Sequence, residues 1–524
     1  TAATQAVGTS ASNVVQLDGS AKLPAVDGSA LTNLPPSGGV VSLVADGNIA
    51  IRKPVILTAA GKAKQIAETT TVASDPSTKL ADLDGSDTTN STVHTEYEPT
   101  SGKFVMLYKD TSNSSYPTIV AGTWDDNNTG SITWGTPEVL NSAATTGGGL
   151  ALAAGNGRIH ATYQSGSPGS GNLNLRTATI GSDLTFSGFS TAVDTFGDDQ
   201  SGTYSGAVQL AFDTSTNYLI TTYTDATDGT GSFYAIPIHI NGTTYTTGSA
   251  STIHSGAQAD YRVGLVFDPD TNRTILAYKD NSNSGYTTVN VIQSSGTSGS
   301  PSLTVGSDVV VDSSGGGTTS LTYDTTNNKV FLTYELGADP EIFGAIGTVN
   351  SGTNSISFTT PATIIDTTSS YEHFDTVYFE DQNKIYFVYK DRDAGDDLTY
   401  KIITPGASSF SVGSAVEVSE NLHNMRPGSA SAGVGKGVLF GLEDYGDSSK
   451  VAYLSFYNAS STASNLDNGN YLGIAAEAIS DTATGKINVI GGTSTGHSSL
   501  TIGNHYFTNG AGTIGLVGNT TGEQ

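Results

Sequence analysis

The sequence contains no cysteine, few basic residues and no long apolar run. The absence of cysteine from all 524 residues excludes a disulfide framework and any thiolate metal site. The 22 lysines and arginines face 49 acidic residues, for a net charge of −27, which excludes the basic face that nucleic-acid binding needs. No stretch approaches the ~20 apolar residues that cross a bilayer, and residues 1–6 lack the pattern of a signal peptide. Nucleic-acid binding and membrane insertion are therefore not expected.

A helical spacing of apolar residues is also missing over any useful length. Hydrophobic residues make up only 36% of the chain, whereas glycine alone contributes 63 residues, and serine and threonine are abundant. This composition is typical of many short strands joined by tight turns. The chain is therefore predicted to be all-β.

One phrase, apolar-x-apolar-Tyr-x-Asp or a near variant, returns seven times along the chain. Successive copies lie 53 to 60 residues apart. The anchor positions are Tyr108, Tyr163, Tyr223, Tyr278, Tyr334, Tyr389 and Leu442. A fixed period of this size in a strand-rich chain indicates repeats arranged around an axis.

Each repeat reads as four antiparallel strands, most clearly in the third copy. Alternating and β-branched segments are separated there by Asp213-Thr-Ser-Thr-Asn217 and by Asn241-Gly242, both of which are turn sequences. The predicted strands are 208–213, 218–223, 233–240 and 243–253. Seven such units predict a seven-bladed β-propeller of four-stranded blades. The alternative, a string of β-sandwich domains, would need ~100 residues per unit, about twice this period.

The seventh repeat lacks an outer strand of the usual form after residues 451–457. Residues 54–70, before the first repeat, resemble the outer-strand phrase at 410–418. We therefore expect residues 54–70 to complete blade seven, which would join the two ends of the ring and remove two exposed sheet edges.

The two ends of the chain resemble fibre proteins of tailed bacteriophages. The phrase Val15-Gln-Leu-Asp-Gly-Ser-Ala-Lys-Leu-Pro-Ala-Val-Asp-Gly-Ser-Ala-Leu-Thr-Asn-Leu34 is similar to shaft segments of tail fibres, and residues 45–62 resemble small fibre modules. Residues 471–507 resemble a small β module of phage and prophage fibres. The resemblance implies a virion protein, outside the host cell and trimeric, that contacts other virion proteins through its N-terminal segment and binds a host-surface glycan or protein.

These observations predict four parts of the chain. The predicted parts are an extended stem at 1–40, a β segment closing the propeller at 41–75, the propeller at 76–460 and a small C-terminal β module at 461–524. A structural virion subunit, for head decoration or as a tail scaffold, remains the alternative function, with the propeller acting as a docking disc.

No enzyme is predicted, although propellers often carry glycosidases. The sequence has seven arginines and none of the Ser-x-Asp-x-Gly-x-Thr-Trp boxes of sialidase-like enzymes. Carboxylates are so numerous that no chosen pair indicates glycoside hydrolysis. No catalytic residue is therefore assigned, and a glycan-degrading enzyme stays as a third hypothesis.

An aspartate follows the repeated tyrosine in five copies, at Asp110, Asp225, Asp280, Asp391 and Asp444. Recurrence in nearly every blade favours a residue that caps its own turn over a ring of ligand-binding acids. Three further acidic groups have oxygen-rich spacing but none matches an EF-hand loop: Asp82/Asp84/Asp87, Asp225/Asp228 and Asp391/Asp393/Asp396/Asp397. No cofactor or metal site is assigned, with Ca²⁺ kept as the one ion to consider.

The connections between blades differ from one another and carry aromatic, histidine and arginine residues. Such residues on variable loops over a rigid scaffold favour ligand recognition, because aromatic rings stack on sugars and arginine binds their hydroxyls. The candidate ligand-binding residues are Tyr204, His254, Tyr261, Arg262, Tyr371, His373, His423 and Arg426. The alternative is that they fill the mouth of the central channel.

Overall fold

The computed structural model divides the chain into two compact units, residues 73–459 and a second unit formed by residues 1–72 and 460–524. The structure describes residues 39–72, 77–84, 93–125, 130–145, 149–165, 172–194, 208–225, 232–255, 262–336, 341–366, 373–391, 397–418, 425–444, 450–457, 460–467, 469–490, 493–498, 500–501, 506–508 and 512–515. In this part of the chain, no helix has the length and apolarity needed to span a membrane.

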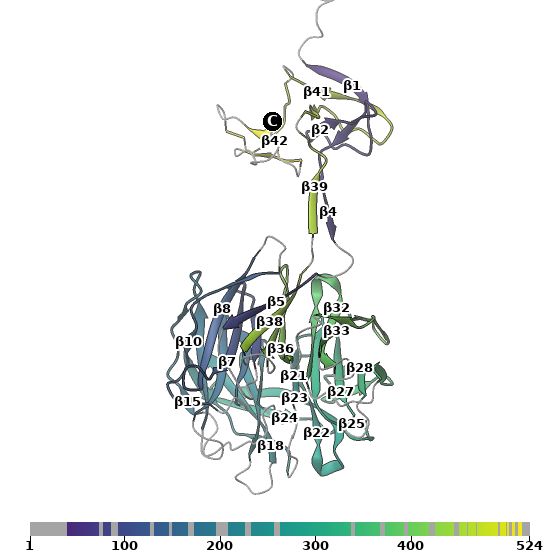
Figure 1. Ribbon diagram of the computed structural model, residues 1–524. Coiled ribbons are helices and arrows are strands. Elements are labelled where there is room, and N and C mark those ends of the chain that lie inside the picture. The colour runs from purple at the N-terminus through teal and green to yellow at the C-terminus, as the bar shows by residue number, and fades with distance from the viewer. Residues whose placement is uncertain are drawn as a thin grey trace, which may run out of the picture. The chain divides into compact units, whose positions relative to one another are not determined.

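The larger unit contains seven antiparallel sheets in chain order, which we number as blades one to seven (Figure 1). The first strands are β6 (His94–Glu98), β11 (Ala151–Gly155), β16 (Gln209–Asp213), β21 (Gly264–Asp268), β26 (Thr319–Asp324), β31 (Phe374–Phe379) and β36 (Met425–Gly433). The second strands are β7 (Lys103–Asp110), β12 (Arg158–Ser165), β17 (Tyr218–Asp225), β22 (Arg273–Asp280), β27 (Lys329–Glu335), β32 (Lys384–Asp391) and β37 (Gly437–Asp444).

Third and fourth strands complete each blade. The third strands are β8 (Tyr116–Trp124), β13 (Asn172–Ile180), β18 (Ser232–Asn241), β23 (Tyr286–Thr297), β28 (Ile342–Asn350), β33 (Asp397–Pro405) and β38 (Lys450–Tyr457). In blades one to six the fourth strand is broken into two pieces that pair with the same third strand. These pieces are β9 (Ile132–Trp134) and β10 (Glu138–Val139), β14 (Phe186–Ser187) and β15 (Val193–Asp194), β19 (Thr244–Thr247) and β20 (Ser251–His254), β24 (Ser300–Val305) and β25 (Val309–Asp312), β29 (Ser355–Phe358) and β30 (Ala362–Ile365), and β34 (Phe410–Val412) and β35 (Val416–Glu417).

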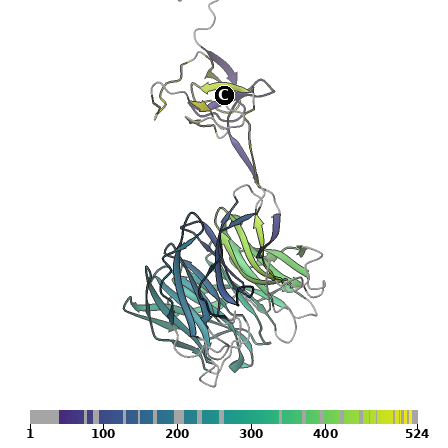
Figure 2. The ribbon, with the colours of Figure 1, turned by 60° about the vertical axis from the view of Figure 1, so that its left-hand side comes forward.

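The seven sheets close into a ring, so the predicted seven-bladed β-propeller is confirmed (Figures 1 and 2). Each first strand contacts the first strand of the next blade, and β36 of blade seven contacts β6 of blade one. Seven apolar clusters fill the seven spaces between neighbouring sheets. The last of them packs Leu439 and Tyr453 of blade seven against Phe104 and Tyr108 of blade one.

Blade seven is completed by β5 (Ser77–Asp84), which pairs with β38 from Tyr457↔Ser77 to Val451↔Asp84. An N-terminal segment was predicted to supply the outer strand of blade seven, and one does. The predicted location of that strand at 54–70 was wrong, and so was the closing role given to residues 41–75. The apolar run at 54–57 instead forms a strand in the sheet of the second unit. Leu80 packs between blades six and seven, and Ala81 and Leu83 pack between blades seven and one, so β5 covers both faces of the closing sheet.

Aspartates shape the turns at both ends of the second strands. At the end of first strand β16, the Oδ1 atom of Asp213 accepts from Ser215 N (2.8 Å) and Thr216 N (3.3 Å), and Asn217 then adopts a left-handed φ of 60°. At the far end of the second strand β7, Asp110 Oδ1 accepts from Asn113 N at 3.0 Å. This confirms the capping interpretation for Asp110.

The second unit combines the two ends of the chain, so residues 41–75 and 461–524 do not form the separate parts that were predicted. Its five-stranded sheet has the order β1-β41-β40-β2-β3, and β39 pairs with β4 in a separate two-stranded ribbon. The strands are β1 (Val40–Val44), β2 (Pro54–Leu57), β3 (Ala63–Gln65), β4 (Glu68–Val72), β39 (Ser460–Ser464), β40 (Tyr471–Ala475), β41 (Thr484–Asn488), β42 (Phe507–Thr508) and β43 (Ile514–Gly515). Residues 1–38 of the predicted stem lie outside the described residues.

Candidate functional site

The first strands bring polar side chains to the centre of the ring. His94 in blade one, Ser320 in blade five and Asp375 in blade six occupy equivalent positions, each four residues before the end of its strand. All three are buried, with 5–8% of their surface exposed. Because these strands contact one another around the axis, a polar network forms where the blades meet.

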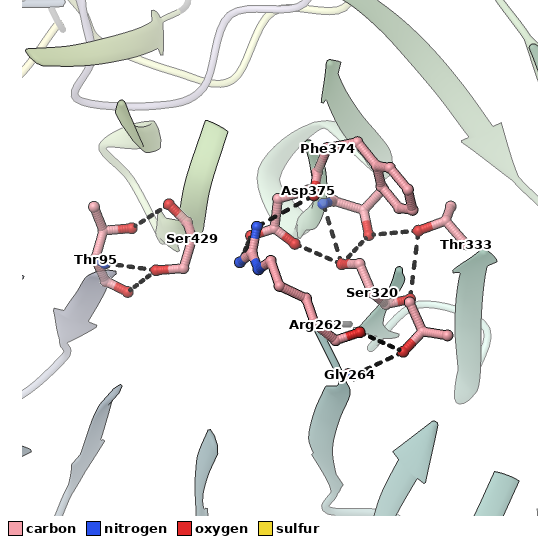
Figure 3. A network of polar contacts seen from close by, with 10 residues as sticks. Thr95, Arg262, Gly264, Ser320, Thr333, Phe374, Asp375 and Ser429 are labelled. Atoms are coloured by element: carbon pink, nitrogen blue, oxygen red, sulfur yellow. Dashed lines mark hydrogen bonds and ion pairs between the residues drawn. The ribbon is translucent and has the colours of Figure 1, made fainter. Parts of the chain in front are cut away.

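Arg262 connects three blades within this network (Figure 3). It lies two residues before β21 of blade four, and its guanidinium reaches β31 of blade six. There Nη1 donates to the Phe374 carbonyl oxygen at 3.3 Å, and Nη2 lies 3.7 Å from Asp375 Oδ2. Ser320 of blade five donates its hydroxyl to Asp375 Oδ1 at 2.6 Å. The arginine therefore spans the space in front of blade five and anchors the ends of three first strands.

Backbone contacts hold Arg262 at this position. The Arg262 carbonyl oxygen accepts from Thr319 N at 3.0 Å, and the Thr319 hydroxyl accepts from Gly264 N at 3.0 Å. Gly264 stands where other blades carry the polar residue, and a Cβ atom there would lie 2.8 Å from Leu321 N. Blade four thus has a glycine, with no side chain, at this position of its first strand. The nearby Arg262 supplies the polar group instead.

A second set of polar contacts, between Thr95 and Ser429, joins blade one to blade seven (Figure 3). Thr95 N donates to Ser429 Oγ at 2.6 Å, and the Thr95 hydroxyl donates to the Ser429 carbonyl oxygen at 3.0 Å. Ser429 N in turn donates to the Val93 carbonyl oxygen at 2.9 Å. These bonds continue the polar lining across the junction where the first and last blades meet.

Burial removes most of the charge from this region at neutral pH. Burial and the nearby Arg262 cation lower the pKa of His94 to about 3, so its imidazole is neutral. Burial raises the pKa of Glu96 to about 8, against the hydrogen bond from Tyr97 N, so this carboxyl group is mostly protonated at pH 7. Burial also raises the pKa of Asp375, an effect that Arg262 and Ser320 oppose. The arrangement suits a neutral ligand rich in hydroxyl groups, which would meet both donors and acceptors.

The structure separates the sequence-predicted site residues. Arg262 belongs to the axial network, whereas His254 lies between blades three and four beside Asp280 and Asp308. His373 is half-buried directly before β31, and its carbonyl oxygen accepts from Lys390 N at 3.2 Å. Arg426 pairs through β36 with Glu443. The remaining candidates, which lie outside the described residues, are Tyr204, Tyr261, Tyr371 and His423.

Sequence reasoning missed the polar residues of the first strands. His94, Glu96, Ser320 and Asp375 were not among the candidate residues, and only an alignment of the first strands shows a recurring polar position. The acidic groups considered for Ca²⁺ are not the cluster that the structure brings together: among the described residues, the group suited to a metal is His254, Asp280 and Asp308. Of the residues in those acidic groups, Asp87, Asp228, Asp393 and Asp396 lie outside the described part of the chain.

Comparison with known proteins shows no family for this chain. No family model matches the sequence, and no curated protein matches it. A 6-phosphogluconolactonase candidate from Bacteroides fragilis is 12% identical, with a TM-score of 0.43 over 72% of this chain and 96% of that one. The Aleuria aurantia lectin, solved with Fucα1-6GlcNAc, is 13% identical, with a TM-score of 0.36 over 64% of this chain and 97% of the lectin. YCF48 from Cyanidioschyzon merolae is 10% identical, with a TM-score of 0.40 over 72% and 98%. These likenesses concern the propeller fold alone.

Proposed function

We propose that this chain is a receptor-binding fibre protein of a bacteriophage virion, which adheres non-covalently to a host-surface glycan or protein. The resemblance of residues 15–34 and 471–507 to fibre segments supports this function. On this proposal the N-terminal segment contacts other virion proteins, the assembly is trimeric and the propeller presents the receptor site. Several weak sites on one particle would then act together through multivalency.

The observation that carries the proposal is the position of the propeller in the chain. Strand β4 before the propeller pairs with β39 after it, from Val72↔Ser460 to Glu68↔Ser464. The fibre-like segments at 45–62 and 471–507 thus belong to one unit, and residues 73–459 are an insertion between two of its paired strands. An inserted domain whose ends meet at one place leaves the rest of its surface free of chain connections, which suits a display function.

The chemistry of the axial network favours a neutral, hydroxyl-rich ligand such as a glycan. Arg262 is engaged by Phe374 and Asp375, and Glu96 keeps its proton at neutral pH. Hydroxyl groups both donate and accept hydrogen bonds, so they satisfy such a mixed lining better than an anion would. Aromatic residues of the connections, Tyr261 among them, would add stacking on sugar rings.

Binding of the labelled full-length chain to a glycan array and to whole host cells tests the proposal. We expect selective binding to a small set of related glycans or to one surface protein. Tyr261→Ala and Arg426→Ala should weaken it at least about tenfold, as hot-spot residues do. Tyr471→Ala, an aromatic truncation in the other unit, is the matched control and should bind as the unmodified chain does.

A cryo-EM map of the native particle separates this proposal from the structural alternative. Exposed blade connections on a threefold stem would support adhesion, and a solution mass of three times the 53.6 kDa chain would support the trimer. Connections buried against neighbouring virion subunits, together with no binding on the arrays, would refute the receptor function and favour a docking disc.

Glu96 gives the enzyme alternative its one specific observation, because a carboxyl group protonated near pH 7 is able to serve as a general acid. Glu96→Gln keeps the shape and a hydrogen-bond donor. We expect this variant to retain glycan binding, and we expect no release of reducing sugar from bound glycans by either form. Sugar release that Glu96→Gln abolishes would instead establish a glycan-degrading enzyme.

A further inference from the structure

Three side chains from two blades converge at the junction of blades three and four. His254 ends β20 of blade three, Asp280 ends β22 of blade four, and Asp308 lies between β24 and β25 of blade four. His254 Nε2 is 3.6 Å from Asp280 Oδ2 and 3.8 Å from Asp308 Oδ2, and the three ligand atoms lie within 4.8 Å of one another. We propose that these atoms bind a divalent metal ion of the Zn²⁺ class, which joins blade three to blade four.

The opposite atom of each ligand is already held by a neighbour. Asp280 Oδ1 accepts from Ser282 N at 3.0 Å and from the Ser282 hydroxyl at 2.6 Å, and Asp308 Oδ1 accepts from Asn290 Nδ2 at 2.7 Å. The Ser282 hydroxyl also lies closer to His254 Nδ1 (3.0 Å) than to Nε2 (3.3 Å). Such outer contacts orient metal ligands, and here they leave both Oδ2 atoms and Nε2 facing one space.

The buried hydroxyl of Tyr278 provides an independent sign of a missing partner. Tyr278 is fully buried, and its hydroxyl has no hydrogen-bond partner in the described structure. Tyr278 lies two residues before Asp280 on β22, so the two side chains stand on the same face of the strand. In blade five the equivalent Tyr334 donates to Asp312 Oδ2 at 2.9 Å. An orphaned buried hydroxyl is destabilising, and a metal-bound water would satisfy it.

The complete ligand set interrupts the repeat, as a functional site is expected to do. Asp308 lies two residues after Gly306, whose N–H donates to the third strand as Gly248 and Gly413 do in blades three and six. The residues equivalent to Asp308 in the other blades with this bond are Pro137, Ala192, Ala250, Pro361 and Ala415. Turn architecture alone therefore does not require a carboxylate at position 308.

The donor set selects the class of ion. One imidazole and two carboxylates suit Zn²⁺ and related transition metals, whereas Ca²⁺ and Mg²⁺ prefer oxygen ligands throughout. Ligands of a tetrahedral ion with bonds of ~2.0–2.1 Å lie roughly 3.3–3.4 Å apart, so the 3.6 and 3.8 Å separations need only small side-chain rotations. Asp308 and His254 are 43% and 26% exposed, so the remaining coordination positions face solvent.

Titration calorimetry of the full-length, chelator-treated chain with ZnCl₂ tests the site. We expect one ion per chain, and Asp308→Ala and His254→Gln should each weaken binding at least about 100-fold, because each removes a direct ligand. Zn²⁺ should also raise the melting temperature of the unmodified chain but not of these variants. Alanine already stands at the equivalent positions 250 and 415, so Asp308→Ala is compatible with the fold.

Asp110→Asn is the matched control, since Asp110 caps the same turn in blade one, where Pro137 replaces the second acid. It should bind Zn²⁺ as the unmodified chain does. With Co²⁺, the visible absorption bands should depend on His254. The proposal is overturned if the unmodified chain binds no more tightly than Asp308→Ala, if Asp110→Asn loses the ion equally, or if His254→Gln leaves binding unchanged.

Discussion

The propeller and the smaller unit bury apolar surface in very different ways. Seven clusters, rich in tyrosine and phenylalanine, fill the spaces between blades, and side chains such as Phe331 and Tyr334 are 0–1% exposed. Among its described residues, the smaller unit has one cluster of alanine, valine and isoleucine around Ile487. Its exposed apolar side chains include Ile490, at 98% exposure. The propeller therefore rests on a far more extensive apolar core than the described part of the smaller unit does.

The largest expected effect is a difference in melting temperature between the two units when each is produced alone. We expect residues 73–459 alone to keep the melting temperature of the propeller within a few degrees. Residues 39–72 linked to 460–524 should unfold at least ~10 °C lower, because so small a core buries too little surface. Circular dichroism melts of both fragments and the full chain measure this. An isolated small unit that melts as high as the propeller would contradict the comparison.

Phe331→Ala tests the propeller core directly. Phe331 is 1% exposed between blades five and six, so truncation should lower the free energy of unfolding by about 3–5 kcal/mol. Urea denaturation followed by tyrosine fluorescence measures the change. The matched control is Phe507→Ala in the smaller unit, where the ring is 38% exposed. It should leave the propeller transition within ~0.5 kcal/mol of its original value.

Acid should weaken the propeller through His160. This imidazole is fully buried and stacks on Phe212 at 5.4 Å between ring centroids, and burial lowers its pKa from 6.5 to about 4. The unfolded chain therefore binds a proton first, and stability is lost as pH falls from about 6.5 towards 4. The expected loss is on the order of 2–3 kcal/mol. Denaturation at pH 7.5 and 4.5 should show a smaller pH difference in His160→Gln, and an equal difference would refute this role.

Glu96 should make the propeller less stable as the pH rises, which is opposite to the effect of His160 and smaller. Its pKa is raised from 4.5 to about 8, so the folded state holds a proton that the unfolded chain releases, and stability falls as pH rises across that window. Partial solvent access limits the effect to about 1–2 kcal/mol. Melting curves at pH 5 and 8.5 should show that Glu96→Gln flattens this decline. An equal decline in the variant would show that the carboxyl group is already ionised in the folded state.

The repeat made the propeller predictable, because each copy carries both its strands and its turns. The closing strand was misplaced because outer strands such as β5 are polar, so their sequences carry little apolar signal. Residues on irregular connections, such as His254 and Arg262, stood out from the repeat. Their partners did not, since Asp375 is 113 positions from Arg262 and only the ring brings them together. Asp308 could not be recognised as a candidate ligand for the same reason. Its position beside His254 depends on how the two pieces of a broken outer strand pair.

Closure of blade seven also means that one strand must wait for its partner while the chain is being synthesised. Strand β5 is made first, but its partner β38 begins only at residue 450. At about 5–20 residues per second, a ribosome needs roughly 20–70 s to bridge that interval, during which β5 has no native partner. The blades made meanwhile present an open edge. The polar character of β5, with Lys79, Asp82 and Asp84 among its eight residues, keeps the waiting strand from pairing with other nascent chains.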